Sequence, residues 1–266
     1  MQPDADLQFN GVTLLTGVFP DEALARVKAD HDKLDATLTR TEVPTDQPAI
    51  VFWRHIQGEK GRVAHFNEFR SLWALIKAVV VPTLRRSLPA LTGRLQLLET
   101  IIFDKPGEIS GALNWHQDVA YFPLVPNNQL AVWIPFDVVT AERGAMQYAL
   151  GSHVHGLMGS TNLHTREPFA GETRPVIPES PEAEGFEVKT FEMTPRDMLI
   201  HDGFTWHRTG PNLIAGHRRR GLSVRFMTSE TVFESRAGQG AAFTRQMQAM
   251  GVKSGETVHG APFPVM

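Results

Sequence analysis

The chain contains no cysteine among its 266 residues. This absence excludes disulfide bonds, thiolate zinc sites, cysteine-ligated iron–sulfur clusters and a cysteine nucleophile. Any metal ion in this protein must therefore be bound through nitrogen and oxygen atoms.

Long apolar runs and a strong net charge are also missing. The apolar run at residues 78–81 ends at Pro82, and no apolar run approaches the roughly 20 residues that span a bilayer. Residues 1–10 carry Asp4 and Asp6 and lack the basic, apolar pattern of a signal peptide. A net charge of -3 gives no reason to expect nucleic acid or an anionic membrane as a partner. We therefore expect a cytoplasmic protein.

The length and composition fit one soluble domain without internal repeats. Two amphipathic helices are predicted early in the chain. The first opens at Pro20 and Asp21 and the second covers residues 67–81, with Pro82 expected to end or kink it. Their predicted buried faces carry Leu24, Val27, His31 and Leu34 in the first helix and Phe69, Leu72 and Ile76 in the second.

From residue 95 the pattern changes to short β-branched and aromatic runs between turn residues, which predicts strands. The expected strands are residues 95–103, 114–121, 130–136, 145–149, 187–193, 198–201, 205–209 and 219–227. This series indicates a mainly β fold with flanking helices, an antiparallel barrel or cupin-like jelly roll. We expect residues 1–94 to form a mostly helical support and pocket segment, 95–227 the core, and 228–266 a C-terminal extension. Residues 161–184 are predicted to form a long loop, either a lid or an ordinary mobile loop.

One short motif suggests a metal site. His116 and Asp118 stand in Asn114-Trp115-His116-Gln117-Asp118, the only His-X-Asp or His-X-Glu in the chain. On a strand, residues two apart point to the same face, so the imidazole and the carboxylate would project side by side. Structural pairs of this kind are common, so the motif alone is weak evidence.

A later histidine strengthens the hypothesis. His207 lies on the second of two short strands separated by a turn. Two histidines and one carboxylate with open positions form the facial triad of non-haem iron(II) oxygenases. Two alternatives remain from the residues alone: His207 is a buried structural histidine, or His201, also at a strand end, is the third ligand.

Three consecutive arginines, Arg218, Arg219 and Arg220, follow this histidine. Such a run is usually a solvated loop. A strand that begins with one inward arginine beside a metal would instead supply a fixed fork for a carboxylate. 2-Oxoglutarate is a cosubstrate that would use both, because one end chelates iron and the other bears a carboxylate.

At these residues the chain resembles the phytanoyl-CoA dioxygenase family of iron(II)/2-oxoglutarate-dependent oxygenases. The resemblance covers residues 95–227 and rests on several blocks in the family's order. These blocks are Phe103-Asp104-Lys105-Pro106-Gly107, Trp115-His116-Gln117-Asp118, the segments 130–137, 142–147 and 151–153, and Trp206-His207 with Gly210-Pro211-Asn212. The resemblance implies a double-stranded β-helix.

The resemblance also implies roles for single residues. His116, Asp118 and His207 would bind Fe(II), and Thr209 would help to bind the distal carboxylate of 2-oxoglutarate. Lys105 would neutralise a carboxylate of the cosubstrate or substrate, or is simply a surface lysine.

The arginine that binds 2-oxoglutarate is ambiguous in the sequence. Spacing from His207 points to Arg218, and spacing from the strand that starts near Gly221 points to Arg219. We prefer Arg219, because loops absorb insertions whereas a one-residue slip in a strand reverses every side chain. Arg225 is expected to be a structural or pocket-edge residue.

The implied reaction consumes 2-oxoglutarate and O2, yields succinate and CO2, and hydroxylates an unactivated C–H bond of a small molecule. Halogenases of this family lack the metal-binding carboxylate, so Asp118 favours hydroxylation, with desaturation, cyclisation and epimerisation still open. The alternatives are a cupin-like metal-dependent isomerase or lyase and a non-catalytic binding protein. Arg54 and His65 are candidate substrate contacts, and Arg54 with Arg62 would suit an acidic substrate, although exposed arginines are more often solvated.

Overall fold

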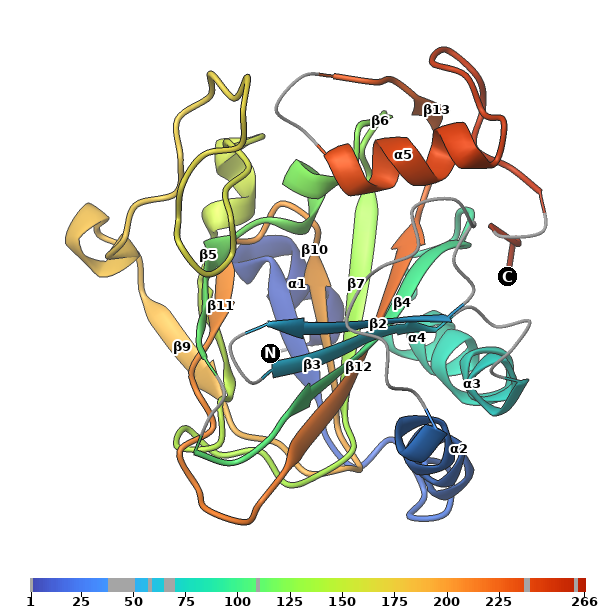
Figure 1. Cartoon of the computed structure of the whole chain (residues 1–266), viewed down its shortest axis with the longest axis vertical. Helices are drawn as coiled ribbons and strands as arrows, with labels where there is room; N and C mark the ends of the chain where they lie inside the picture. Colours follow the sequence, from blue (N-terminus) through green and yellow to red (C-terminus); the bar gives the residue numbers. More distant parts are fainter. Residues whose placement is uncertain are drawn as a thin grey trace.

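Two antiparallel sheets face each other in the computed structural model (Figure 1). The structure describes residues 2–37, 51–56, 59–64, 70–108, 111–236, 240–260 and 263–266. The major sheet has seven strands in the order β1-β10-β7-β12-β4-β3-β2, and the minor sheet has four in the order β5-β11-β8-β9. The strand order is that of a double-stranded β-helix, which confirms the predicted fold class.

The strands of the major sheet are β1 (Val12–Leu15), β2 (Val51–Ile56), β3 (Glu59–Ala64), β4 (Gln96–Lys105), β7 (Gln129–Pro135), β10 (Met198–Asp202) and β12 (Arg219–Met227). Those of the minor sheet are β5 (Leu113–His116), β8 (Met146–Ala149), β9 (Val188–Phe191) and β11 (His207–Thr209). A third, two-stranded sheet pairs β6 (Leu124–Val125) with β13 (Val232–Phe233). Each of the eight predicted strands corresponds to one strand of the two large sheets.

The segment before residue 95 holds helices and also supplies β1, β2 and β3 at the two edges of the major sheet. The predicted strand 114–121 is only half correct, because β5 ends at His116 and Asp118 begins a 3-10 helix, η2 (Asp118–Tyr121). Strand alternation therefore does not orient the Asp118 side chain.

Helices cover the outer face of the major sheet, the face turned away from the minor sheet (Figure 1). They are α2 (Ala25–Thr37), α3 (Arg70–Leu75), the π-helical segment η1 (Ile76–Val80) and α4 (Val81–Ser87). The helix does not end at residue 81, which was one of the two outcomes predicted for Pro82. Its type changes there instead, because Pro82 stands in the first turn of α4, which directly follows the π-helical segment η1.

The remaining helices and short turns lie outside this layer. They are α1 (Pro3–Asn10), α5 (Ala241–Ala249), η3 (Ser152–His155) and η4 (Pro181–Glu184). In the part of the chain that the structure describes, no helix is both long and apolar enough to cross a membrane.

Alternation along β12 separates the apolar core from the polar interior. Leu222, Val224 and Phe226 point outward into the buried cluster with the helices. The intervening residues of β12 therefore face the minor sheet. They include two buried arginines, Arg219 and Arg225, so the space between the sheets holds charge rather than a purely apolar core.

Candidate metal centre

Three aromatic rings form a row across the inner face of the minor sheet. In the strand register His207 pairs with His116 on one side and with Tyr148 on the other. Asp118 follows two residues after His116, at the start of η2. One ligand atom each from His116, Asp118 and His207 lie within 4.8 Å of one another, and all three residues are buried. The structure thus brings together the three predicted ligands.

The backbone fixes which nitrogen of each imidazole can bind a metal. Nδ1 of His116 lies 2.7 Å from the carbonyl oxygen of Asn114, and Nδ1 of His207 lies 2.9 Å from that of Thr205. A carbonyl only accepts hydrogen bonds, so each Nδ1 carries the proton and donates it. Each Nε2 is left with a lone pair, because the hydrogen bond at Nδ1 fixes the tautomer that can bind a metal.

Burial also sets the charge of these ligands. Burial lowers the pKa of His116 to about 4 and that of His207 well below its ordinary value. For Asp118 burial alone would raise the pKa, but the Arg225 charge and hydrogen bonds from His201 and Arg225 hold it well below the usual range. Two neutral imidazoles and one carboxylate are the donor set that suits a divalent iron site with open positions.

His201, the rival third ligand, contacts the Asp118 carboxylate and is not one of the three grouped ligands. Its Nε2 is 3.2 Å from Asp118 Oδ2 and its Nδ1 is 3.0 Å from the Tyr148 hydroxyl. Both ring nitrogens are therefore occupied by polar side chains, and the group of three candidate ligands does not include His201.

A second polar cluster lies further along the same interior. Lys105 on β4 and Arg219 on β12 are register partners and both are buried. Nζ of Lys105 donates a hydrogen bond of 2.7 Å to Oγ1 of Thr209, which stands two residues after His207 on β11. The Arg219 guanidinium lies 4.9 Å from the ring centre of Trp133 and donates to the carbonyl oxygen of Gly144.

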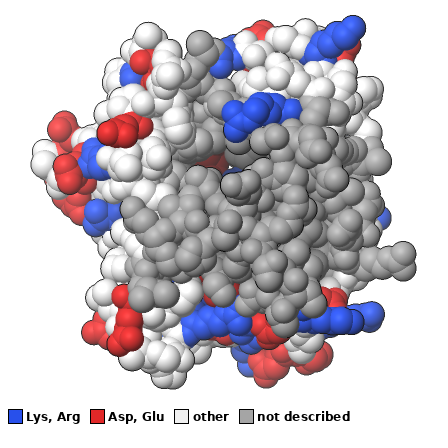
Figure 2. All heavy atoms as spheres, in the orientation of Figure 1, with Lys and Arg blue, Asp and Glu red and all other residues white. Residues whose placement is uncertain are grey.

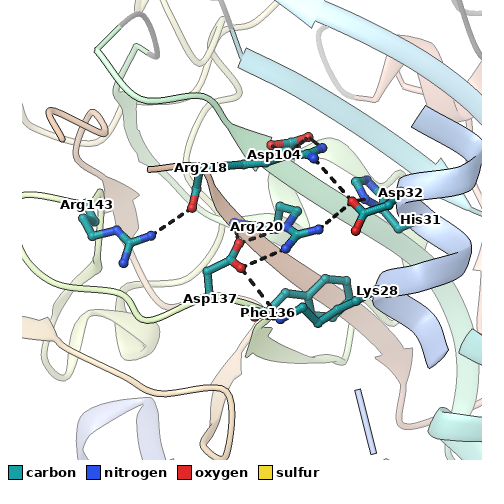
Figure 3. Close-up of polar contacts among 9 residues, drawn as sticks. All are labelled: Lys28, His31, Asp32, Asp104, Phe136, Asp137, Arg143, Arg218 and Arg220. Atoms are coloured by element: carbon teal, nitrogen blue, oxygen red, sulfur yellow. Dashed lines mark hydrogen bonds and ion pairs between the residues drawn. The ribbon is translucent and has the colours of Figure 1, made fainter. Parts of the chain in front are cut away.

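Arg218 and Arg220, on either side of Arg219 in the chain, contact acidic residues instead (Figure 3). Nε of Arg218 lies 3.0 Å from Oδ1 of Asp104, and the same side chain reaches Asp32 on α2. Arg220 pairs with Asp137 at 2.9 Å and with Asp32 at 2.7 Å. Arg218 and Arg220 therefore lie on the outer face of the sheet, and Arg219 is the arginine that faces the interior.

Arg225, expected to be a structural or pocket-edge residue, donates to Asp118 Oδ1 at 2.8 Å and to Glu99 Oε2 at 2.6 Å. Two further residues near the metal ligands, Glu99 and Tyr148, were not predicted for this site. No motif in the sequence marks them, because strand pairing alone brings them to Asp118.

The loop predicted at residues 161–184 is bonded to both sides of the metal motif. The backbone N–H of Asn114 donates to Leu163 and its side chain to His164, with distances of 2.8 and 3.1 Å. The Tyr121 hydroxyl donates to the Thr161 carbonyl at 2.7 Å. These bonds connect the loop to residues two before His116 and three after Asp118.

The predicted substrate contacts cannot be placed in the same way. His65 lies outside the described residues, and for Arg54 the structure describes only the backbone, in β2. Figure 2 shows a narrow hollow in this face of the molecule, with acidic side chains visible inside it.

Comparison with solved structures supports the fold. The epimerase SnoN in complex with Fe3+, alpha ketoglutarate and nogalamycin RO is 18% identical, with a TM-score of 0.78 over 99% of this chain and 96% of SnoN. The carbocyclase SnoK from nogalamycin biosynthesis is 18% identical, with a TM-score of 0.71 over 99% and 94% of the two chains. EvdO2 from Micromonospora carbonacea var. aurantiaca, complexed with 2-oxoglutarate, is 18% identical, with a TM-score of 0.60 over 88% and 93%.

None of the curated proteins matches the chain in sequence. The family model described as phytanoyl-CoA dioxygenase (PhyH) matches residues 7–221. This match covers most of the chain and includes the candidate ligands, the Lys105–Thr209 contact and the start of β12. The chain therefore belongs to the phytanoyl-CoA dioxygenase family of iron- and 2-oxoglutarate-dependent oxygenases.

Proposed function

We propose that this protein is an Fe(II)/2-oxoglutarate-dependent dioxygenase that hydroxylates a C–H bond of a small molecule. The observation that carries the proposal is the buried triad of His116, Asp118 and His207, whose ligand atoms lie within 4.8 Å of one another. Both histidines present a deprotonated Nε2, because their Nδ1 atoms donate to backbone carbonyls. These residues would hold Fe(II).

We assign the distal carboxylate of 2-oxoglutarate to Arg219, Thr209 and Lys105. Arg219 offers a planar fork of donors, the geometry that suits a carboxylate. Thr209 adds a hydroxyl on the strand that carries His207, and Lys105 adds a buried positive charge. Arg218 has no part in this assignment, since it pairs with acidic residues on the outer face.

When bound, the iron supplies the oxidising power for C–H cleavage, drawing electrons from 2-oxoglutarate to activate O2. The side chains of the protein position the substrate and cosubstrate and shield them from solvent. Ile101 and Phe103 lie between Glu99 and Lys105 on the same face of β4, so apolar side chains line the interior between these two charged residues. Hydrogen bonds from Asn114 and Tyr121 hold the loop of residues 161–184 next to the metal motif.

Related proteins show that one scaffold serves several outcomes, since SnoN is described as an epimerase and SnoK as a carbocyclase. Our proposal of hydroxylation rests on Asp118, which occupies the position where a halogenase would bind halide. Mass spectrometry of products from a small-molecule panel distinguishes the outcomes. Hydroxylation adds one oxygen atom, cyclisation removes two hydrogen atoms, and epimerisation leaves the mass unchanged.

The family chemistry itself has a more direct test. Anaerobic addition of Fe(II) and 2-oxoglutarate should produce a weak visible charge-transfer band, and O2 should then convert 2-oxoglutarate into succinate. His116→Ala, Asp118→Ala and His207→Ala should each abolish the band and the turnover while the protein stays folded by circular dichroism. A wild-type protein that binds metal but shows neither band nor succinate would favour a metal-dependent isomerase or lyase. A folded wild type without metal binding would favour a binding protein.

A further inference from the structure

We propose that Arg225 and His201 are positioning residues that hold the Asp118 carboxylate at the metal site from the opposite sheet. Glu99 and Tyr148 in turn fix these two residues. The inference rests on the proposed metal-binding function of the triad. It explains how Asp118 is oriented, since β5 ends at His116 and the backbone of Asp118 belongs to a 3-10 helix.

The holding residues come from one row across the major sheet. In the strand register Glu99 pairs with Arg225, Arg225 with Ala131, and Ala131 with His201. Partners across adjacent strands point to the same face of a sheet, so this row faces the minor sheet at the level of the metal ligands. Arg225 and His201 are two strands apart, about 10 Å at their backbones.

The small residue between them leaves the space that a carboxylate needs. Ala131 is fully buried and has only a methyl group. Asp118 Oδ1 accepts from Arg225 at 2.8 Å, and Asp118 Oδ2 lies 3.2 Å from Nε2 of His201. The carboxylate is thus held at both oxygen atoms, one by each neighbour of Ala131.

On one side the guanidinium is fixed by a second acid. Arg225 uses one terminal nitrogen for Asp118 and the other for Glu99, at 2.6 Å. A planar guanidinium bonded at both ends cannot rotate without losing a charge-assisted hydrogen bond. Glu99 therefore sets the direction from which Arg225 approaches Asp118.

On the other side a hydroxyl fixes the tautomer of His201. An ionised carboxylate only accepts hydrogen bonds, so Nε2 of His201 must carry the proton that Asp118 accepts. Nδ1 then accepts from the Tyr148 hydroxyl, 3.0 Å away. Without that hydroxyl the imidazole could place its proton on Nδ1 and turn a lone pair towards Asp118.

The consequence is a carboxylate that cannot swing freely. Each oxygen of Asp118 already accepts one bond from the major sheet, so its remaining lone pairs are held towards His116 and His207. Removal of a residue that hydrogen-bonds to a metal ligand typically changes metal affinity by about 10- to 100-fold. We expect the same range here.

The test uses Tyr148→Phe, which removes only the hydroxyl and retains the ring stacked on His207. Apo protein is titrated with Co(II), with the visible d–d spectrum and the dissociation constant as readouts. The expected result is about a tenfold or larger weakening of Co(II) binding with a changed spectrum, and little change in the apo melting temperature. Ala131→Val, which fills the space below the carboxylate without removing a polar group, should have the same effect.

Arg220→Gln is the matched control, because Arg220 is a largely buried, ion-paired arginine on the outer face of β12, the strand that carries Arg225. It should lower the apo melting temperature and leave the Co(II) constant and spectrum unchanged. Unchanged Co(II) binding in folded Tyr148→Phe would overturn the inference, but it would leave the proposed metal-binding role of the triad unaffected. If Ala131→Val does not fold, Tyr148→Phe alone decides. A folded wild type that binds no Co(II) or Fe(II) would overturn the proposed function, and the inference with it.

Discussion

Lys105 Nζ and Thr209 Oγ1 form a 2.7 Å hydrogen bond that joins β4 of the major sheet to β11 of the minor sheet. The ammonium can only donate, so the threonine oxygen accepts this bond and keeps its own proton for another acceptor. Lys105 also donates to the carbonyl oxygens of Gly111 and Gly210, at 2.9 and 3.1 Å. Its effect on a bound carboxylate is therefore its charge and its orientation of Thr209.

This relationship gives the first prediction, for Thr209→Val and Lys105→Met. Thr209→Val should raise the 2-oxoglutarate concentration for half-maximal turnover roughly tenfold, the loss of one hydrogen bond to a charged group. Lys105→Met should raise it at least as much, because it removes the charge and the fixed orientation of the hydroxyl. Kinetics of the double variant provide the check. Because Lys105 acts partly through Thr209, the free-energy effect of the double variant should be smaller than the sum of the two single-variant effects. An effect equal to that sum would mean that the two residues act independently.

The second prediction concerns the neighbouring arginines. Arg219→Ala should raise the half-saturating 2-oxoglutarate concentration roughly 10- to 100-fold, since a charge-assisted contact to a carboxylate is lost. Arg218→Ala should leave this concentration near the wild-type value and lower the melting temperature, because it breaks the ion pairs with Asp104 and Asp32. Steady-state kinetics and thermal melts of both variants decide the matter. The reverse pattern would mean that the assignment of Arg219 is wrong.

Gly221 is the subject of the third prediction. A Cβ at this position would lie 2.1 Å from Cζ2 of Trp133, whose ring packs against the Arg219 guanidinium. Gly221→Ala must therefore displace the indole, and overpacking of this kind costs typically 1–3 kcal/mol of stability. We expect a lower melting temperature together with a higher requirement for 2-oxoglutarate. Ser223→Ala, two residues further along the strand, is the control and should leave that requirement unchanged.

The fourth prediction is a pH dependence in the loop near the metal motif. Burial alone would raise the pKa of Glu172, but hydrogen bonds from Arg174 and from Ser160 lower it to about 2. A carboxyl with a depressed pKa stabilises the folded loop above its ordinary pKa of 4.5, and this contribution is lost as the pH falls towards 2.

Hydrogen exchange of residues 158–176 at a series of pH values tests this. At pH 6 Glu172→Gln should exchange faster than wild type in this segment, and the difference should shrink between pH 4.5 and 2. Glu167→Gln alters an exposed carboxyl of the same loop and serves as the control. A difference between Glu172→Gln and wild type that does not depend on pH would contradict the prediction.

The strands and the triad could be predicted because each depends on local pattern. Short apolar runs between turn residues mark β4, β7 and β12, and the motif around His116 marks a family. The position of Asp118 in η2 and the passage of a helix through Pro82 could not be predicted, since both depend on tertiary packing that overrides local preference. The contact of Arg225 with Asp118 joins residues 107 positions apart and exists only through strand register.

The outer ion pairs of Arg218 and Arg220 have a consequence for folding. A slip of one residue at the start of β12 would turn both arginines inward and carry Arg219 out of the interior. Asp104 and Asp137 would then face neither guanidinium that they pair with now (Figure 3). These pairs thus penalise the wrong alignment of β12 from a face that never meets the reactants. These ion pairs therefore favour one register of β12 over another during folding, more than they stabilise the finished sheet.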